Sequence, residues 1–251
     1  MPATRRGPVK ARYHCMMRMR YIPFILFAAL TALTALPAKA LVGIVLTVEG
    51  QVNVISGKQE CGLRYGLDLD EGDTVRTGEK SWAVLSLLDG AKITVRPSTE
   101  VRIEAYRFTA NGDAPQNFAT LALAHGSLRI ITGAIAKGRN SGYRVRTPEV
   151  TLEMRGTDHD ITHVAAPVTP QATSLGDAAP GSYGKTYAGE AAIKSAGGEL
   201  TLREGQSAYA ALRARAAPRL LTTEPWFFSM YSSIDRRAAA VADALLGPNI
   251  Q

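Results

Sequence analysis

The sequence predicts an all-β body, either a jelly-roll-like sandwich or a short β-solenoid of many short strands, with one C-terminal amphipathic helix. Apolar side chains recur at every second position in many short segments between residues 41 and 210, which is the period of strands with one buried face. Turns rich in Gly and Asp separate those segments. After residue 224 the apolar spacing changes to that of a helix.

Charge and composition limit the expected partners. The chain has 251 residues, 46% of them hydrophobic, which is enough to form a core. Its formal charge of +7 arises in the first 40 residues, which hold seven basic residues and no acidic ones. The remaining 22 basic residues equal the 22 acidic ones. No basic face is implied, and we expect no nucleic-acid partner.

The N-terminal segment has the pattern of a secretory signal peptide. Basic residues precede a short apolar run, Tyr21 to Leu36, and the small residues Ala38 and Ala40 follow it. We expect residues 1–40 to be removed by cleavage after Ala40, so that the protein is periplasmic and contacts the membrane through the leader. An uncleaved anchor is the alternative, although the run is short for a span of ~20 residues. Cys61 then remains as a small apolar core residue or pairs with another chain.

Strand segments follow one another along the exported part. They are expected at Val45–Glu49, Val52–Ile55, Ser81–Leu88, Ala91–Val95, Val101–Ala105, Phe118–Ala124, Leu128–Thr132, Tyr183–Ser195, Leu200–Arg203 and Ser207–Ala210. The clearest hairpin has Asp89 and Gly90 between its strands, a strong turn signal because both turn positions need positive φ. Asp89 and Gly90 are therefore predicted structural-motif residues.

The chain is organised around Val145–Val164, where a regular strand is interrupted. Residues 150–154 alternate apolar and polar side chains, and Gly156 then breaks the pattern. Straight alternation would bury two unpaired carboxylates, Asp158 and Asp160, at a high cost. A one-residue bulge at Gly156 exchanges the faces, so we expect both aspartates to face water.

Three residues at this bulge form a predicted structural motif. Thr157 and His159 would follow the apolar residues inward. Arg155 has five fixed donors that could tie neighbouring carbonyls together, and Gly156 lets another backbone come close. Arg155, Gly156 and Thr157 are therefore interpreted as a structural clasp and not as a catalytic site.

The tail predicts a helix over Glu224–Leu246, with Thr223 as its N-cap and Gly247-Pro248 as its stop. Its apolar stripe indicates that the helix covers an open end or edge of the sheet. Its aromatic start also suits contact with a partner or a membrane surface, and this alternative stays open.

Taken together, these motifs resemble the periplasmic domain of the FecR family, over roughly Gly43–Ala210. The resemblance rests on their order and spacing: Val48–Val54, Leu69–Gly78, Ala83–Gly90, His125–Arg129, Val145–Pro148, Arg155–Asp158, Gly189–Ile193 and Leu202–Ser207. We accordingly divide the chain into a signal peptide (1–40), a FecR-like β domain (41–215) and a C-terminal helical tail (216–251).

The resemblance implies an exported all-β domain used for protein contact or signal relay and not for catalysis. Signalling members of the family carry an anti-sigma segment and a membrane span before this domain, whereas this chain has a leader there, which weakens a direct anti-sigma role. The family also places a large aromatic residue after the Arg-Gly-Thr-Asp motif. Here that position is His159, which leaves a titratable group inside the domain.

Other chemistry finds little support in the sequence. His159 and His163 with Asp158 and Asp160 suggest a metal site, but positions i and i+4 of a strand lie about 13 Å apart at ~3.3 Å per residue. The acidic stretch 68–73 resembles a calcium loop by composition alone, so a solvated turn is favoured. No Gly-x-Ser-x-Gly elbow is present. We expect no catalytic residue, no metal and no cofactor.

The leading functional hypothesis is a non-enzymatic binding or scaffolding module of the bacterial envelope, which recognises a protein partner through loops or an exposed strand edge. The alternative is a carbohydrate- or peptidoglycan-binding module, which exposed aromatic residues on one sheet face would favour. An enzyme acting on envelope polymers would need two carboxylates converging in a cleft.

Overall fold

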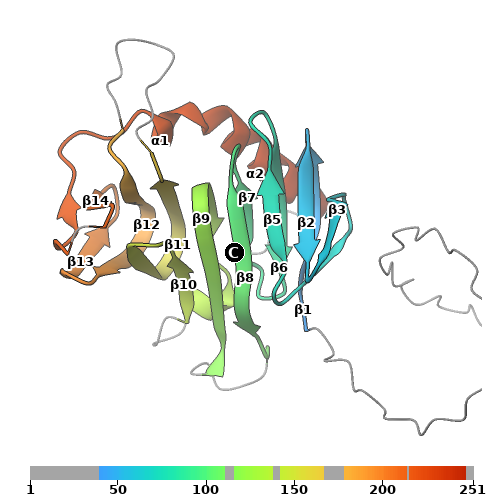
Figure 1. The fold of residues 1–251 in the computed structure, drawn as a ribbon. Coiled ribbons are helices and arrows are strands. Elements are labelled where there is room, and N and C mark those ends of the chain that lie inside the picture. The colour runs from blue at the N-terminus through green and yellow to red at the C-terminus, as the bar shows by residue number, and fades with distance from the viewer. Residues whose placement is uncertain (1–39, 111–115, 138–141, 167–177, 214, 247–251) are drawn as a thin grey trace, which may run out of the picture.

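A computed structural model describes residues 40–110, 116–137, 142–166, 178–213 and 215–246 (Figure 1). The predicted signal peptide lies outside these residues apart from Ala40, and so does the predicted helix stop at Gly247-Pro248. For Thr157 the backbone is described but the side chain is not.

The described strands belong to one sheet of fifteen strands, and pairing is antiparallel everywhere except between β9 and β10. The strands are β1 (Leu41–Glu49), β2 (Val52–Ser56), β3 (Gln59–Gly62), β4 (Asp68–Asp70), β5 (Thr74–Thr77), β6 (Trp82–Leu87), β7 (Lys92–Val95), β8 (Glu100–Arg107), β9 (Phe118–Ile131), β10 (Tyr143–Arg146), β11 (Val150–Val164), β12 (Gly181–Ser195), β13 (Gly198–Arg203), β14 (Ser207–Ala211) and β15 (Arg219–Leu220). The helices are η2 (Ala134–Lys137), α1 (Phe227–Met230) and α2 (Ser232–Leu246).

The sheet curves around one main core. Buried side chains from strands far apart in the sheet order, such as Val54 of β2 and Leu202 of β13, belong to the same apolar cluster. Cys61 is partly buried against this core. The predicted fold class, an all-β body of many short strands with one C-terminal amphipathic helix, is confirmed.

The β6–β7 hairpin forms where it was predicted, but its turn has a different geometry. Gly90 has a φ of +86°, whereas Asp89 does not have a positive φ. The N–H of Gly90 donates to the carbonyl of Leu87 at 2.9 Å, and the N–H of Leu87 donates to the carbonyl of Ala91 at 2.9 Å. A type I turn followed by a left-handed glycine therefore closes this hairpin, and the expectation of two positive φ angles was wrong.

Asp89 is buried and links this turn to two other elements. Its carboxylate accepts hydrogen bonds from the N–H of Ala91 at 3.3 Å and of Ile135 in η2 at 3.4 Å. The hydroxyl of Tyr106 in β8 accepts from the Asp89 N–H at 2.9 Å and donates to its carboxylate at 3.3 Å. Burial raises the pKa of Asp89, while these hydrogen bonds oppose the rise.

The predicted bulge is present in β11. Gly156 has a φ of +103°, and the pairing register of β11 with β12 shifts between Arg155 and His159. A Cβ added to Gly156 would lie 2.8 Å from the Cα of Gly189, so the backbones approach closely there. Arg155 is exposed at this bend.

The tail differs from its prediction in two ways. It first adds β15 to β14, and the predicted single helix is divided into the one-turn α1 and the longer α2. Thr223 is not the N-cap, because Trp226 holds that position in α1. Pro225 explains the late start, since a proline disfavours helical backbone at the residue before it.

Candidate functional site

Past the bulge, β11 presents charged side chains to the outer face of the sheet, which is the face opposite the main core. Arg129 of β9 donates to both carboxylate oxygens of Asp158, at 3.0 Å from Nε and 2.7 Å from Nη2. Arg96, which directly follows β7, donates from Nη2 to both oxygens of Asp160, at 3.0 and 2.8 Å. Arg96 and Arg129 thus each have a carboxylate partner of their own on β11.

A fifth charge reaches these pairs from α2. Asp235 accepts from Nε and Nη2 of Arg96 at 3.2 and 2.7 Å, and from Nη1 of Arg129 at 3.2 Å. We call Arg96, Arg129, Asp158, Asp160 and Asp235 the arginine–aspartate network. It joins three strand regions to the C-terminal helix.

The expectation that both aspartates face water was wrong for Asp160. The bulge does turn Asp158 and Asp160 away from the core, but α2 packs against β1, β6 and β7 (Figure 1), and its Asp235 contacts the arginines that pair with both aspartates. Asp160 is 0% exposed and also accepts a hydrogen bond from the Tyr187 hydroxyl at 3.0 Å, whereas the Asp158 side chain is 21% exposed. The outer face is a second interior, which the strand alternation alone did not reveal.

Burial and mutual charge set the ionisation of this network. Burial raises the pKa of Asp160 to about 6, and the charge of Asp235 adds to the rise, while Arg96 and Arg129 oppose it. Burial acts to lower the pKa of Arg96, but the charges of Asp160 and Asp235 outweigh burial and raise it. Three carboxylates therefore share two guanidiniums when α2 is in place.

The two histidines of β11 point to the opposite side, toward the core. His159 lies 1% exposed beside Thr186, with Nδ1 3.3 Å from its hydroxyl, and burial lowers the His159 pKa to about 4. His163 is also buried, 3.2 Å from the Ser182 hydroxyl through Nδ1. Among the described residues, no group of three or more potential ligand side chains is placed to hold a metal ion.

Ser182, His163 and Glu149 meet, but not in the geometry of a nucleophilic triad. Ser182 donates to Glu149 at 2.8 Å, and both Ser182 and Glu149 lie at Nδ1 of His163, the latter at 3.1 Å. In a triad the two partners occupy different ring nitrogens. Ser182 is fully buried as well, so this cluster satisfies polar groups inside the sheet.

Two surface grooves run along α2, and a third lies at its C-terminal end. The largest, the β1 groove of about 610 Å³, is lined by Leu46, Thr47, Val48, Leu63, Arg64, Tyr65, Val241, Ala244 and Leu245. The β9 groove, about 290 Å³, includes Val84, Arg129, Ile131, Asp235 and Ala239. The hairpin groove, about 390 Å³, lies between Ile44, Leu88 and Leu246.

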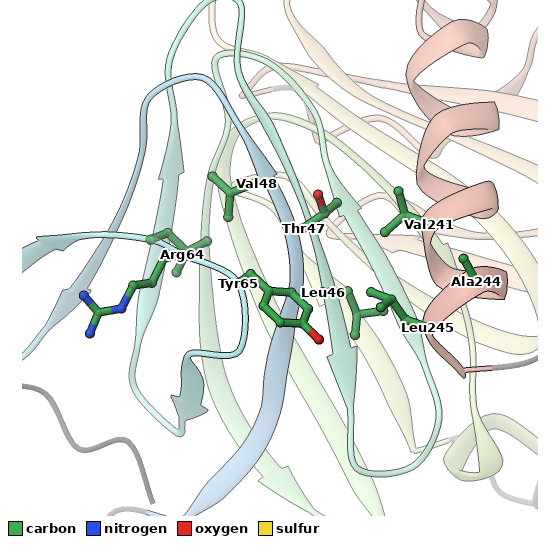
Figure 2. Close-up of a pocket in the computed structure, with 9 residues that line it drawn as sticks. Leu46, Thr47, Val48, Arg64, Tyr65, Val241, Ala244 and Leu245 are labelled. Atoms are coloured by element: carbon green, nitrogen blue, oxygen red, sulfur yellow. The ribbon is translucent and has the colours of Figure 1, made fainter. Parts of the chain in front are cut away.

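Exposed apolar side chains gather at these grooves. In Figure 2, Tyr65 and Leu245 flank Leu46 in the β1 groove, and Arg64 extends beyond its rim. Of the eight large hydrophobic residues found exposed in the described part of the chain, five line one of the three grooves: Ile44, Tyr65, Leu88, Ile131 and Leu245. Such clustering is typical of an interaction surface and not of scattered surface residues.

Sequence reasoning identified β11 but missed its partners. Arg96, Arg129, Tyr65 and Asp235 were not predicted to have a role. One signal for Asp235 was available: it lies three and seven residues before Ala238 and Ala242, on the buried side of the predicted helix. An acidic residue within an apolar helix stripe indicates a buried counter-charge.

Comparisons with known proteins agree with the sequence motifs. The family model described as FecR protein matches residues 73–170, a narrower region than the Gly43–Ala210 stretch expected. No curated protein matches the chain. Neither α-helix that the structure describes has the length and apolar character that crossing a membrane requires.

Two solved structures of a candidate anti-sigma factor from Parabacteroides distasonis resemble part of the chain. Each has 11% sequence identity and a TM-score of 0.43, and each alignment covers 63% of this chain and 63% of the other. The chain therefore spans less than two thirds of the length of those chains.

Proposed function

We propose that this chain, whose residues 73–170 match the FecR family model, is an exported, non-enzymatic module of the bacterial envelope that binds a protein partner in signal relay. The family is regulatory, which supports a signalling role. The signal-peptide pattern of residues 1–40 supports export to the periplasm.

The observation that carries this proposal is the apolar surface along α2. Its largest part, the β1 groove, combines an aromatic ring, aliphatic side chains and an arginine at the rim, namely Tyr65, Leu245 and Arg64. Aromatic residues and arginine are enriched at protein–protein contacts, where an apolar centre is surrounded by polar groups. The surface therefore suits a protein partner.

The titratable groups support a non-enzymatic role. The carboxylates of the arginine–aspartate network are held by guanidiniums beneath a helix, and Asp160 has no exposed surface. The Ser182–His163–Glu149 cluster is buried and has both partners at one ring nitrogen. A general acid or base must reach a substrate proton. Asp160, Ser182 and His163 are enclosed by protein, and the partly exposed Asp158 is held through both carboxylate oxygens by Arg129.

Site-specific photocrosslinking in envelope preparations tests the proposal. A photoreactive residue at position 245 is expected to form a discrete adduct with an envelope protein, and Tyr65→Ser is expected to reduce that adduct several-fold. Position 220 is a matched control, because Leu220 and Leu245 are 44% and 45% exposed and Leu220 lies on β15, away from the grooves. Equal labelling from both positions would contradict a protein-binding role for the α2 surface.

A glycan-binding function is the second candidate, and one pocket favours it. Tyr183, Tyr209 and Trp226 line a space of about 270 Å³ together with Arg219 and Glu224, so aromatic faces and charged groups meet there. Peptidoglycan fragments should then change the fluorescence of Trp226, and Trp226→Phe should abolish that change. The other tryptophan, Trp82, is 3% exposed and lies beneath α2, so it provides an unaffected signal within the same protein. No change on adding fragments would eliminate this candidate.

A further inference from the structure

The helix α2 fits its position on the sheet poorly. Its fully buried residues are two alanines, Ala238 and Ala242, which pack against the large side chains of Leu46, Trp82 and Val84. The larger Ile234 and Leu246 pack there only near the helix ends and are partly buried. Close packing in a protein interior normally matches large side chains with complementary ones. The β1 and β9 grooves on its flanks, of about 610 and 290 Å³, are the space that the small residues of this helix leave open.

The charges beneath α2 would remain balanced without it. Arg96 would keep Asp160 and Arg129 would keep Asp158, two guanidiniums with two carboxylates that all belong to the sheet. Breaking a buried pair is costly because a charge is left alone, but removal of Asp235 leaves no such charge on the sheet. The sheet therefore carries two preformed arginine–aspartate pairs, and these pairs accept one further carboxylate from a helix.

The other polar contacts of α2 are weak restraints. Arg237 pairs with Glu49 and Lys92 pairs with Asp243, and in each pair at least one side chain is more than half exposed. Exposed ion pairs of this kind contribute little to stability. The attachment of α2 thus rests on Asp235 and on apolar contacts, which come from two alanines in its middle and from Ile234 and Leu246 near its ends.

From these observations, and resting on the protein-binding function proposed above, we propose that α2 occupies the site of the partner. The partner docks an amphipathic helix there by displacing α2. That helix carries a carboxylate at the place of Asp235 and larger apolar side chains at the places of Ala239 and Ala244, which border the β9 and β1 grooves. The Nε of Arg96 and the Nη1 of Arg129, two donors that Asp160 and Asp158 leave unused, select the carboxylate, and the grooves select the larger side chains.

The occupant is a helix because the site already accommodates one. The spacing of Asp235, Ala238 and Ala242 places a carboxylate and two small contacts on one helical face. The fifteen residues of α2 span about 22 Å, which sets the length of the docked segment. Helix-in-groove recognition uses the same pattern of anchors at i, i+3 and i+7.

A synthetic peptide with the sequence of residues 232–246 and the changes Ala239→Leu and Ala244→Leu is the probe. Its binding to the chain from Leu41 onward is measured by fluorescence anisotropy, and hydrogen exchange of α2 is measured in the same samples. We expect saturable binding, faster exchange of the α2 amides on binding, and at least tenfold weaker binding by a peptide that also carries Asp235→Lys. In the protein, Asp235→Asn should loosen α2 and strengthen binding of the probe several-fold.

Four results would overturn the proposal. The first three are no binding, equal binding by the Asp235→Lys peptide, and binding that leaves α2 exchange unchanged. The fourth is concentration-dependent dimerisation in place of peptide binding, because the occupant would then be a second copy of the chain. The peptide measurement needs no natural partner. An adduct at position 245 without peptide binding rejects the helix-exchange inference alone, because α2 then stays in place when the partner binds. Peptide binding with no envelope adduct from position 245 or from position 65, which lines the β1 groove from outside α2, rejects the proposed function.

Discussion

On the inner face of the sheet, large aliphatic side chains from nearly every strand pack against one another. On the outer face, by contrast, paired charges lie beneath a helix whose fully buried side chains are small. Leu128, Ile130 and Leu152 represent the first kind and are at most 1% exposed. Ala238 and Asp235 represent the second. The inner face buries enough apolar area to stabilise the fold. The outer face is held by fewer and more specific contacts, which suits an exchangeable surface.

Removal of Arg96 should have the largest effect, because Arg96 pairs with carboxylates of both the sheet and α2. Arg96→Met leaves the fully buried Asp160 without its bidentate partner, and we expect a loss of about 4 kcal/mol in the free energy of unfolding, measured with urea. Arg144→Met is the matched control, because Arg144 is 41% exposed in its pair with Glu153 and should cost less than about 1 kcal/mol. Equal losses would show that the network is no more important than a surface ion pair.

A leucine in each region tests the contrast in packing directly. Leu128→Ala creates a cavity in the main core and should cost about 3 kcal/mol of unfolding free energy. Leu245→Ala removes a side chain that is 45% exposed beside the β1 groove and should change stability by less than about 0.5 kcal/mol. A large loss for Leu245→Ala would mean that the groove surface stabilises the fold and is not free for a partner.

The inner face should also make the protein sensitive to acid through His159. Burial lowers the pKa of His159 from 6.5 to about 4, so its contribution to stability is complete above pH 6.5 and is lost as pH falls toward 4. His159→Phe should remove this loss, which amounts to about 3 kcal/mol between pH 6.5 and 4. The exposed His125 is the control, and His125→Gln should keep the acid sensitivity of the parent protein.

The raised pKa of Asp160 acts in the opposite direction, since stability from that group falls as pH rises from about 4 to 6. The effect of His159 is therefore measured as the difference between the parent protein and His159→Phe at each pH. A difference that does not change with pH would contradict a neutral, buried His159.

The same contrast explains how much the sequence could predict. Alternation and turn residues predicted the all-β class, the hairpin at Asp89-Gly90 and the bulge at Gly156, because local backbone preferences and one buried face determine these features. They did not predict the burial of Asp160, because that depends on α2, which follows β11 by about 70 residues. Alternation shows which side chains share a face, but it does not show what covers that face.

Asp235 is the last and most selective test, because it lies where the two regions meet. Asp235→Asn keeps the shape of the side chain but removes the charge that faces Arg96 and Arg129, while each arginine keeps its own aspartate. The expected loss in global unfolding free energy is therefore small, about 1 kcal/mol. Hydrogen exchange of the α2 amides should accelerate several-fold while that of β9 and β11 stays the same, because local opening needs only the helix to leave.

The pKa of Asp160 should also fall, since the Asp235 charge raises it. Asp243→Asn, an exposed position on the same helix, should leave the exchange of α2 nearly unchanged. If Asp235→Asn destabilised the protein as much as Arg96→Met, α2 would be part of the folding core, and its exchange for a partner helix would cost too much free energy to occur.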